Sequence, residues 1–398
     1  MTQEGGNGHK NHALVFGASG LIGWSCVNQL LASYPERGVF DSVTALTNRP
    51  VKAEGSFWPT GPDIPRLKLI SGIDLTKGNG EGVELAVNLR AENLESVTHV
   101  FYFVFTSLDD HFEEVATNKR MLQNVLGALN ILRAPLKCVV FPGGTRGYGI
   151  YRPGGTFTPP LKEDMVDSLP PDYAKTVVYP VFRQLLDEAS QGNAWTWCEI
   201  CPDVITGFTP NGSQFSLALH WAQYLSLYAH NHSPGSQVPF PGVQAVYDAK
   251  MTAVSASTLA RFAIYASVNP ERCGGGQLFN VGDRAEPTTF GYIWPRLAGW
   301  FGLEGSRPPS GRETGDMIMP GAYIAEHRQA FRAKGLERAE KAGVSAGSSQ
   351  LDSIGTWLAF DRQLSLDRLR NSGFQEERDP VEGWIEAFEG FRKAGLIF

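Results

Sequence analysis

Residues 13–23 read ALVFGASGLIG, a short apolar run followed by glycines at positions 17, 20 and 23. A continuous apolar run of this kind is typical of a parallel strand that is buried on both faces. Gly17 permits a tight turn, Gly20 lets the backbone approach a pyrophosphate, and Gly23 lets a helix pack closely on the strand. We expect that helix at 21–34, with its first N–H groups directed at the phosphates. The pattern therefore predicts a dinucleotide-binding turn between a strand and a helix.

The residues after the second apolar run indicate which dinucleotide would bind. This run, at 42–47, is followed by Asn48 and Arg49, and no acid stands between Asp41 and Glu54. An NAD-binding chain usually has Asp or Glu at the end of this strand, where the carboxylate binds the ribose hydroxyls. Asn48 offers a hydrogen-bond donor instead, and Arg49 offers a forked cation that suits phosphate. We therefore expect NADPH/NADP+ as the cofactor, the alternative being an ordinary surface role for Arg49.

The first half of the chain alternates between short apolar runs and helical patterns. Such alternation is typical of βαβ units, which build a parallel sheet with helices on both faces. We therefore predict an α/β Rossmann fold, a doubly wound parallel sheet accompanied by a smaller, mostly helical part. Beyond the two runs already described, the expected strands lie at 67–70, 97–104, 137–141 and 195–202.

The chain divides into two regions that differ in residue pattern and composition. Residues 1–206 carry the alternating pattern and form the expected NADP-binding domain, whereas 207–398 are richer in Pro and Gly and form the expected substrate-binding or lid region. A long aromatic helix is predicted at 216–230, either as core packing or as a wall of the substrate pocket. The apolar segment near 277–282 is expected to return to the first domain as a further strand, which would interleave the two parts.

The composition is that of a folded protein of enzyme size. With 398 residues, 42% of them hydrophobic and 19% charged, the chain can bury a large core. A net charge of −6 without a basic block argues against nucleic acid as a partner. No run reaches the roughly 18 apolar residues that span a bilayer, and the polar first residues do not resemble a signal peptide. We expect a cytoplasmic protein with a small-molecule substrate and no membrane span, and leave open a homodimer.

The cysteines do not suggest a metal site. There are five of them, and Cys198 and Cys201 form a CxxC pair within an expected strand. Residues three apart on a strand face opposite ways, so these two thiols cannot share a ligand. No second cysteine pair or histidine cluster completes a zinc site. We therefore predict structural cysteines, no disulfide and no metal.

An enzyme that acts on a carbonyl needs a group to handle the oxygen. In most short-chain dehydrogenases this group is the tyrosine of Tyr-x-x-x-Lys, whose lysine lowers the tyrosine pKa, and no such motif occurs in this chain. Tyr179 nevertheless begins a predicted helix after the fifth strand, with Arg183 one turn later on the same face. Arg146 and Tyr148 lie directly after that strand, at the sheet edge where ligands bind in open α/β folds.

With these features, the chain resembles a known family. This family is the atypical extended short-chain dehydrogenases, which include plant progesterone 5β-reductases and iridoid synthases and have many fungal relatives. The resemblance covers most of the chain, from about residue 12 to about residue 300. The motifs that carry it are GASGLIG at 17–23, Asn48-Arg49-Pro50, Ile73-Asp74-Leu75, Thr98-His-Val-Phe-Tyr102, Asn118-x-x-Met121-Leu-x-Asn-Val125, Tyr179, Pro202-Asp-Val-Ile-x-Gly-Phe208 and Phe279-Asn280-Val281.

The resemblance implies NADPH-dependent 1,4-reduction of the C=C bond of an activated enone or enal, in a pathway of the secondary-metabolite type. Hydride goes to the β-carbon, and a tyrosine with a partner lysine stabilises the enolate oxygen. Tyr179 matches that tyrosine, but Arg146 stands at the position of the lysine. The family's acidic pair after the tyrosine is replaced by Phe182 and Arg183, and its pocket tryptophan by Phe105. Arg146 keeps the positive charge and can still donate hydrogen bonds.

These considerations define a predicted site and leave some choices open. Tyr179 and Arg146 are the predicted catalytic residues, although Arg183 remains an alternative partner of Tyr179. An NADPH-dependent carbonyl reductase, and a non-redox isomerase or cyclase with a structural NADP(H), are the alternative functions. For Phe105 and Tyr148, ordinary packing is an alternative to a place in the substrate pocket.

The predicted cofactor-binding residues are Gly17, Ser19, Gly20, Leu21, Ile22, Gly23, Asn48, Arg49, Asp74, Leu75, Val104, Pro202 and Ile205. The predicted residues for a largely apolar carbonyl substrate are Phe105, Tyr148 and Phe208.

Overall fold

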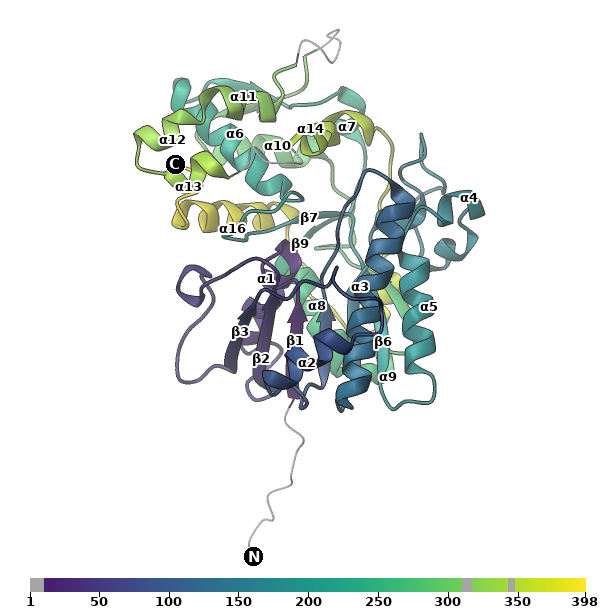
Figure 1. Ribbon diagram of the computed structural model, residues 1–398. Helices are drawn as coiled ribbons and strands as arrows, with labels where there is room; N and C mark the ends of the chain where they lie inside the picture. The colour runs from purple at the N-terminus through teal and green to yellow at the C-terminus, as the bar shows by residue number, and fades with distance from the viewer. Residues whose placement is uncertain (1–10, 310–316, 343–347) are drawn as a thin grey trace, which may run out of the picture.

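The computed structural model describes residues 11–309, 317–342 and 348–398, and a seven-stranded parallel sheet lies at its centre (Figure 1). Its strands are β1 (Asn11–Phe16), β2 (Phe40–Thr47), β3 (Arg66–Ser71), β4 (His99–Tyr102), β5 (Cys138–Pro142), β6 (Thr196–Cys201) and β10 (Gln277–Asn280). From edge to edge the order is β10-β6-β5-β4-β1-β2-β3, and each neighbouring pair is parallel. The order reverses between β1 and β4, which confirms the predicted Rossmann fold class.

Helices cover both faces of this sheet. Helices α1 and α8 pack together on one face, and α2, α3 and α5 cover the other. Each face buries its own apolar core, so the central strands are apolar on both sides. The bounds of these helices are α1 (Leu21–Leu31), α2 (Val83–Ala91), α3 (His111–Leu132), α5 (Tyr179–Ser190) and α8 (Ala256–Val268).

The sheet is completed by a strand from the second half of the chain. The expected strand near 277–282 is β10, which pairs with β6 in parallel register at the edge of the sheet. Two short ribbons lie outside the sheet. They are β7 (Val204–Thr206) with β9 (Ala253–Ser255), and β8 (Gln237–Pro239) with β11 (Glu304–Ser306).

A largely helical part lies over the carboxyl end of the sheet and has its own aromatic core (Figure 1). Helix α6 is the aromatic helix expected at 216–230, and its Trp221 stacks on Trp384 of α16 at 5.2 Å between ring centroids. Core packing therefore accounts for most of α6. The helices of this part are α6 (Leu217–Asn231), α7 (Gln244–Asp248), α10 (Phe290–Trp300), α11 (Pro320–His327), α12 (Gln329–Ala333), α13 (Glu337–Lys341), α14 (Ser348–Trp357) and α16 (Pro380–Lys393).

Several short elements connect these layers. The helical ones are α4 (Pro171–Ala174), α9 (Pro270–Cys273) and α15 (Asp367–Asn371), and the 3-10 helices are η1 (Ala53–Gly55), η2 (Thr145–Tyr148) and η3 (Glu163–Ser168). Among the described residues, no helix is both long and apolar enough to cross a membrane.

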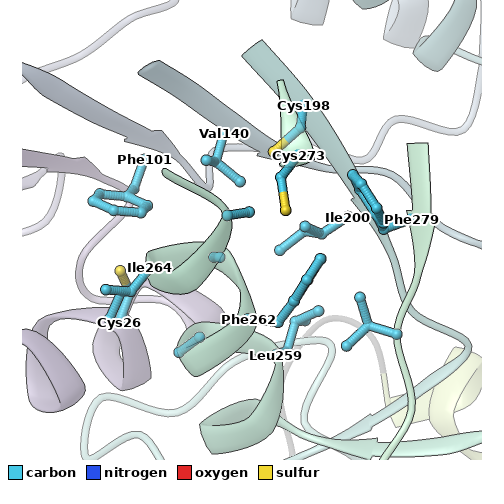
Figure 2. Close-up of a cluster of buried hydrophobic side chains, with 14 of the residues drawn as sticks. Cys26, Phe101, Val140, Cys198, Ile200, Leu259, Phe262, Ile264, Cys273 and Phe279 are labelled. Atoms are coloured by element: carbon cyan, nitrogen blue, oxygen red, sulfur yellow. The ribbon is translucent and has the colours of Figure 1, made fainter. Parts of the chain in front are cut away.

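The cysteines lie inside the molecule. All five belong to the described residues, and each is buried with a free thiol, as predicted. Figure 2 shows Cys26, Cys198 and Cys273 among the apolar side chains that surround helix α8. Within the described ranges, no group of three or more histidine, cysteine or acidic side chains is arranged to hold a metal ion.

Candidate active site

The turn between β1 and α1 can accommodate only glycine at two of its three glycine positions. Gly17 has a φ of +75°, and a Cβ added there would lie 2.3 Å from the carbonyl oxygen of Phe103. A Cβ on Gly23 would lie 2.2 Å from the carbonyl oxygen of Gly17. At Gly20 the nearest atom would be 3.3 Å away, which leaves nearly enough room for a side chain. The fold itself thus explains Gly17 and Gly23, whereas no severe overlap within the chain requires glycine at position 20.

The residues between these glycines hold the turn against the second half of the chain. The hydroxyl of Thr209 donates to the carbonyl oxygen of Ser19 at 3.0 Å. Leu21 lies against Gly207, and Ile22 packs on the core beneath α1. Gly20 is the N-cap residue of α1 and has no side chain that could occupy the first N–H groups of the helix. The turn therefore presents free N–H donors at a helix N-terminus, where an anion is stabilised.

Asn48 and Arg49 lie directly after β2, at the same edge of the sheet as the glycine turn. Both are exposed. The hydroxyl of Thr47 donates to the carbonyl oxygen of Arg49 at 2.8 Å, which fixes the backbone just after the strand. Arg49 therefore follows an ordered backbone at the end of β2, the strand that pairs with β1.

Asp74 and Leu75 line a pocket of about 610 Å³ after β3. The Asp74 carboxylate accepts hydrogen bonds from the backbone N–H and the hydroxyl of Thr76, at 3.0 and 2.7 Å. Asn124 of α3 closes the inner side of the pocket and donates to the carbonyl oxygen of Leu75 at 3.0 Å. On the other side of the turn, Val104 is half-buried, with a methyl group 3.3 Å from the position that a Cβ on Gly17 would take.

Pro202 and Ile205 follow β6 at the same sheet edge. The carbonyl oxygen of Pro202, a buried residue, accepts from the backbone N–H of Thr145 at 3.3 Å. Ile205 is half-buried in β7 and packs on the core shared with α1 and α8. The predicted cofactor-binding residues thus come from the ends of β1, β2, β3, β4 and β6, which meet at the carboxyl edge of the sheet.

Tyr179 is the first residue of α5, and its phenol lies across the segment that follows β5. Its hydroxyl oxygen is 2.9 Å from where a Cβ on Gly144 would be, and its ring is 3.1 Å from the same position on Gly147. Glycine at these two positions therefore makes room for the phenol. Burial raises the pKa of Tyr179, and nearby Arg146 acts in the opposite direction. Among the described residues, the Tyr179 hydroxyl has no hydrogen-bond partner.

Arg146 is held on three sides rather than exposed to solvent. Its Nη1 donates to Oε1 of Glu114 and its Nη2 to the carbonyl oxygen of Thr176 at 2.6 Å. The guanidinium also lies over the ring of Tyr151, 5.2 Å from its centroid. Burial opposes the charged form, but the hydrogen bond and the charge of Glu114 outweigh it and raise the pKa of Arg146. Glu114 is a functional candidate that our sequence analysis missed.

Arg183, the alternative partner of Tyr179, is engaged elsewhere. Its Nε and Nη2 donate to the two carboxylate oxygens of Glu199 on β6, at 2.6 and 3.3 Å. The Glu199 side chain packs directly against Gly143. Burial raises the pKa of Glu199, and Arg183 opposes that shift. The Arg183 guanidinium is thus occupied by Glu199, whereas the charge of Arg146 acts on Tyr179, which favours Arg146 as the partner of the phenol.

A third buried ion pair supports the same segment from the end of the chain. The hydroxyl of Thr145 donates to Oδ1 of Asp203 at 3.0 Å, and Nε of Arg362 lies 3.1 Å from Oδ2. The side chains of Arg362 and Asp203 are 1% and 3% exposed. Asp203 belongs to a motif after β6 that the sequence singled out, but nothing in the sequence identified its partner.

Four exposed aromatic residues form two contacts. Phe105 and Phe215, 36% and 41% exposed, have their ring centroids 6.4 Å apart. Tyr151 and Trp357, 43% and 38% exposed, meet edge to face at 5.1 Å. Tyr151 is also the ring beneath Arg146. Phe105 is therefore available to a ligand, and Phe215, Tyr151 and Trp357 join it as candidates that the sequence did not suggest.

Tyr148 and Phe208 lie in packed surroundings. Tyr148 is 1% exposed, and its hydroxyl donates to Oδ1 of Asn280 at 2.7 Å. This position matches the packing alternative rather than a pocket wall. Phe208 meets Trp24 of α1 at 4.8 Å and Phe391 of α16 at 5.4 Å, so its ring packs between the two parts of the molecule.

The parallel sheet, its glycine turn and a second helical part over the carboxyl edge define an extended short-chain dehydrogenase/reductase. The fold is also that of the GDP-mannoheptose C4 reductase from Campylobacter jejuni, solved with NADP bound, at a TM-score of 0.60 and 13% identity over 97% of this chain and 100% of that one. Within this class, the chain belongs to the PRISE-like Rossmann-fold family, whose model matches residues 13–398.

Relatives within the family extend over nearly the whole chain. The short chain dehydrogenase sirQ of Leptosphaeria maculans is 32% identical over 97% of each chain. The 3-oxo-Delta(4,5)-steroid 5-beta-reductase of Arabidopsis thaliana is 25% identical over 96% of this chain and 92% of its own. The family that the sequence motifs resembled is thereby confirmed.

Proposed function

We propose that this protein is an NADPH-dependent reductase that reduces the C=C bond of an activated enone or enal, in a pathway of the secondary-metabolite type. The observation that carries the proposal is the phenol of Tyr179, which lies across Gly144 at the carboxyl edge of the sheet without a hydrogen bond to a described residue. The likeness to a relative named as a 3-oxo-steroid reductase supports an enone as the substrate.

The glycine turn fits a dinucleotide. Its helix N-terminus is uncapped, and Gly20 lacks a side chain at the point of closest approach. In this proposal Arg49 binds the 2′-phosphate, and Asp74 and Leu75 bind the adenine end. We assign residues 1–206, together with the returning strand near 277–282, to the cofactor, and the remainder of 207–398 to the substrate or lid. When bound, NADPH supplies the hydride.

Tyr179 handles the oxygen of the substrate. As hydride adds to the β-carbon, the C=C electron pair moves toward the carbonyl and negative charge develops on its oxygen. The phenol donates a hydrogen bond to that oxygen, and the α-carbon then takes a proton from solvent to complete the saturated carbonyl compound. Because burial raises its pKa, the Tyr179 phenol remains a hydrogen-bond donor at neutral pH. One such donor, aimed at developing charge, is worth about 3–4 kcal/mol.

The exposed aromatic side chains favour a largely apolar substrate. Phe105, Phe215, Tyr151 and Trp357 leave apolar surface open to a ligand, and the Tyr151 ring lies against the Arg146 guanidinium. A small-molecule site of this kind is mostly apolar, with a few polar groups that fix the orientation of the ligand.

The test compares three substrates of similar size. NADPH consumption is measured by absorbance with a cyclic enone, the corresponding saturated ketone and a saturated aldehyde, and the products are identified by mass spectrometry. We expect consumption with the enone alone and a product in which only the C=C bond is saturated. Turnover of the plain carbonyls would identify a carbonyl reductase instead, and cofactor binding without any turnover would point to a non-redox isomerase or cyclase.

A further inference from the structure

Glu114 is a buried carboxylate with both oxygens engaged near the candidate active site. It lies in the first turn of α3, and its side chain is 2% exposed, whereas its neighbour Glu113 is exposed. Oε1 accepts from Arg146, and Oε2 accepts from the backbone N–H of Leu108 at 3.1 Å. A carboxylate is costly to bury without such partners. Glu114 thus joins Arg146 to the segment between β4 and α3 that also carries Phe105.

The contacts of Arg146 leave one of its donors without a partner. With Nη1 on Glu114 and Nη2 on Thr176, the guanidinium cannot rotate without losing both bonds. Its Nε is buried and has no hydrogen-bond partner among the described residues. Buried N–H groups are rarely left unpaired in folded proteins, and an exception calls for an explanation. The Nε atoms of Arg284 and Arg378 are also buried without a partner among the described residues, so this feature is not particular to Arg146.

The charges around Tyr179 come as two opposed pairs. Arg146 favours the ionised form of the phenol and is itself paired with Glu114. Glu199 disfavours the ionised form and is paired with Arg183. The other titratable groups that act on Tyr179 are Cys201 and Tyr151, both of which disfavour ionisation. Removing Glu114 alone would leave the positive charge of Arg146 uncompensated beside the phenol.

We propose that Glu114 is a positioning residue: it holds the Arg146 guanidinium beside Tyr179 and balances its charge, so that Tyr179 stays a neutral donor. The proposal rests on the role of Tyr179 in the proposed function. In the family, a lysine stands at this position and assists the tyrosine. In this proposal, Arg146 instead assists Tyr179 only when it is paired with Glu114.

The first test uses Glu114→Gln, with Glu113→Gln on the exposed side of the same helix as the matched control. For Glu114→Gln we expect kcat with the enone to fall about tenfold or more, while the Kd for NADPH stays within about twofold. The fall in activity at high pH should also begin at lower pH than in wild type, because uncompensated Arg146 favours ionisation of Tyr179. A residue that served stability alone would lower activity equally at every pH. Behaviour like that of Glu113→Gln would overturn the proposal.

A second test needs neither substrate nor cofactor. Urea unfolding of wild type, Glu114→Gln, Arg146→Met and the double variant gives the coupling between the two side chains. We expect the unfolding equilibrium constants to show a coupling of about tenfold or more, and additive effects would overturn the proposal. The two proposals fail separately. An inactive wild type would remove the reductase function, whereas an active wild type with additive variants would remove only the role of Glu114.

Discussion

At the scale of single residues, the candidate site is a neutral phenol beside two ion pairs, in each of which an arginine is balanced by a glutamate. The Arg146–Glu114 and Arg183–Glu199 pairs each have a carboxylate that is at most 2% exposed. Burying such pairs costs desolvation energy that their attraction only partly offsets, so they are weak evidence of stabilisation. In the proposed function, these pairs provide a fixed electrostatic field where negative charge develops on the substrate oxygen. Without such a field, water would have to reorganise in order to solvate that charge.

Replacing Tyr179 with phenylalanine removes the proposed donor and keeps the ring that packs on Gly144 and Gly147. We expect Tyr179→Phe to lower kcat for the enone at least about tenfold, because the developing oxyanion loses a hydrogen bond. The Kd for NADPH, measured by fluorescence titration, should stay within about twofold. Tyr265→Phe is the control, since that phenol bonds the carbonyl oxygen of Ser372. Unchanged kcat in Tyr179→Phe would exclude Tyr179 from the chemistry.

Charge reversal at Arg49 tests the choice of cofactor. Glutamate at this exposed position would repel a 2′-phosphate and could bind ribose hydroxyls instead. We expect Arg49→Glu to weaken NADPH binding at least about tenfold while NADH binding changes little or improves, since only NADPH carries the phosphate. Calorimetry of both cofactors measures this difference. Lys52→Glu, an exposed charge reversal nearby, controls for the general change in charge. An equal loss of both cofactors would contradict the phosphate role.

At the scale of elements, the sheet could be predicted because its information is local. Each strand is a short apolar run, so the strands at 42–47 and 137–141 could be located from the sequence alone. The glycine pattern likewise indicated the first βα unit. The ion pairs could not. Arg146 and Glu114 are 32 residues apart, and Arg362 and Asp203 are 159 apart. Which side chains meet across such separations depends on packing that no periodicity encodes.

The same limit applies to the aromatic residues. Tyr148 and Phe105 both follow strands at the carboxyl edge, so position along the chain treats them alike. The structure separates them, since Tyr148 is buried and bonded to Asn280 while Phe105 remains exposed. Tyr148 is the last residue of η2, and its burial against Asn280 depends on a contact with a residue 132 positions away that the sequence pattern did not reveal.

The glycine turn allows folding and cofactor binding to be separated. Gly23→Ala should lower the free energy of unfolding by about 1–3 kcal/mol, because its Cβ would overlap the carbonyl oxygen of Gly17. Gly20→Ala should leave stability nearly unchanged but weaken NADPH binding strongly, because the methyl group would stand where the pyrophosphate approaches.

Urea unfolding and cofactor titration measure the two effects. Gly299→Ala is the control, since nothing lies within 4 Å of the added Cβ and it sits within helix α10. It should leave stability unchanged or raise it by up to about 1 kcal/mol. Normal NADPH binding in Gly20→Ala would argue against a phosphate at this turn.

At the scale of the whole molecule, the end of the chain holds the candidate active site together. The segment that carries Arg362 lies between α14 and α15, yet its guanidinium reaches Asp203 after β6 and, through that carboxylate, Thr145 beside Arg146. The backbone of the same segment pairs with residue 161 through the Leu161–Leu364 bridge. Segments more than 150 residues apart are thus joined at one buried point, so the sheet and the helical part are expected to unfold together.

Breaking this ion pair tests that connection. Arg362→Met leaves a buried carboxylate without its partner, and the free energy of unfolding should fall by about 3–5 kcal/mol. The double variant Asp203→Asn with Arg362→Met removes both charges and should recover much of that loss.

Burial already raises the pKa of Asp203 despite Arg362, which opposes the shift. Without Arg362 the carboxyl prefers its protonated form still more, and stability that depends on protonation is present at low pH and lost as pH rises through the folded-state pKa. The deficit of Arg362→Met relative to wild type should therefore grow between acidic and neutral pH in thermal melts, and a deficit that is constant with pH would show that Asp203 does not depend on Arg362.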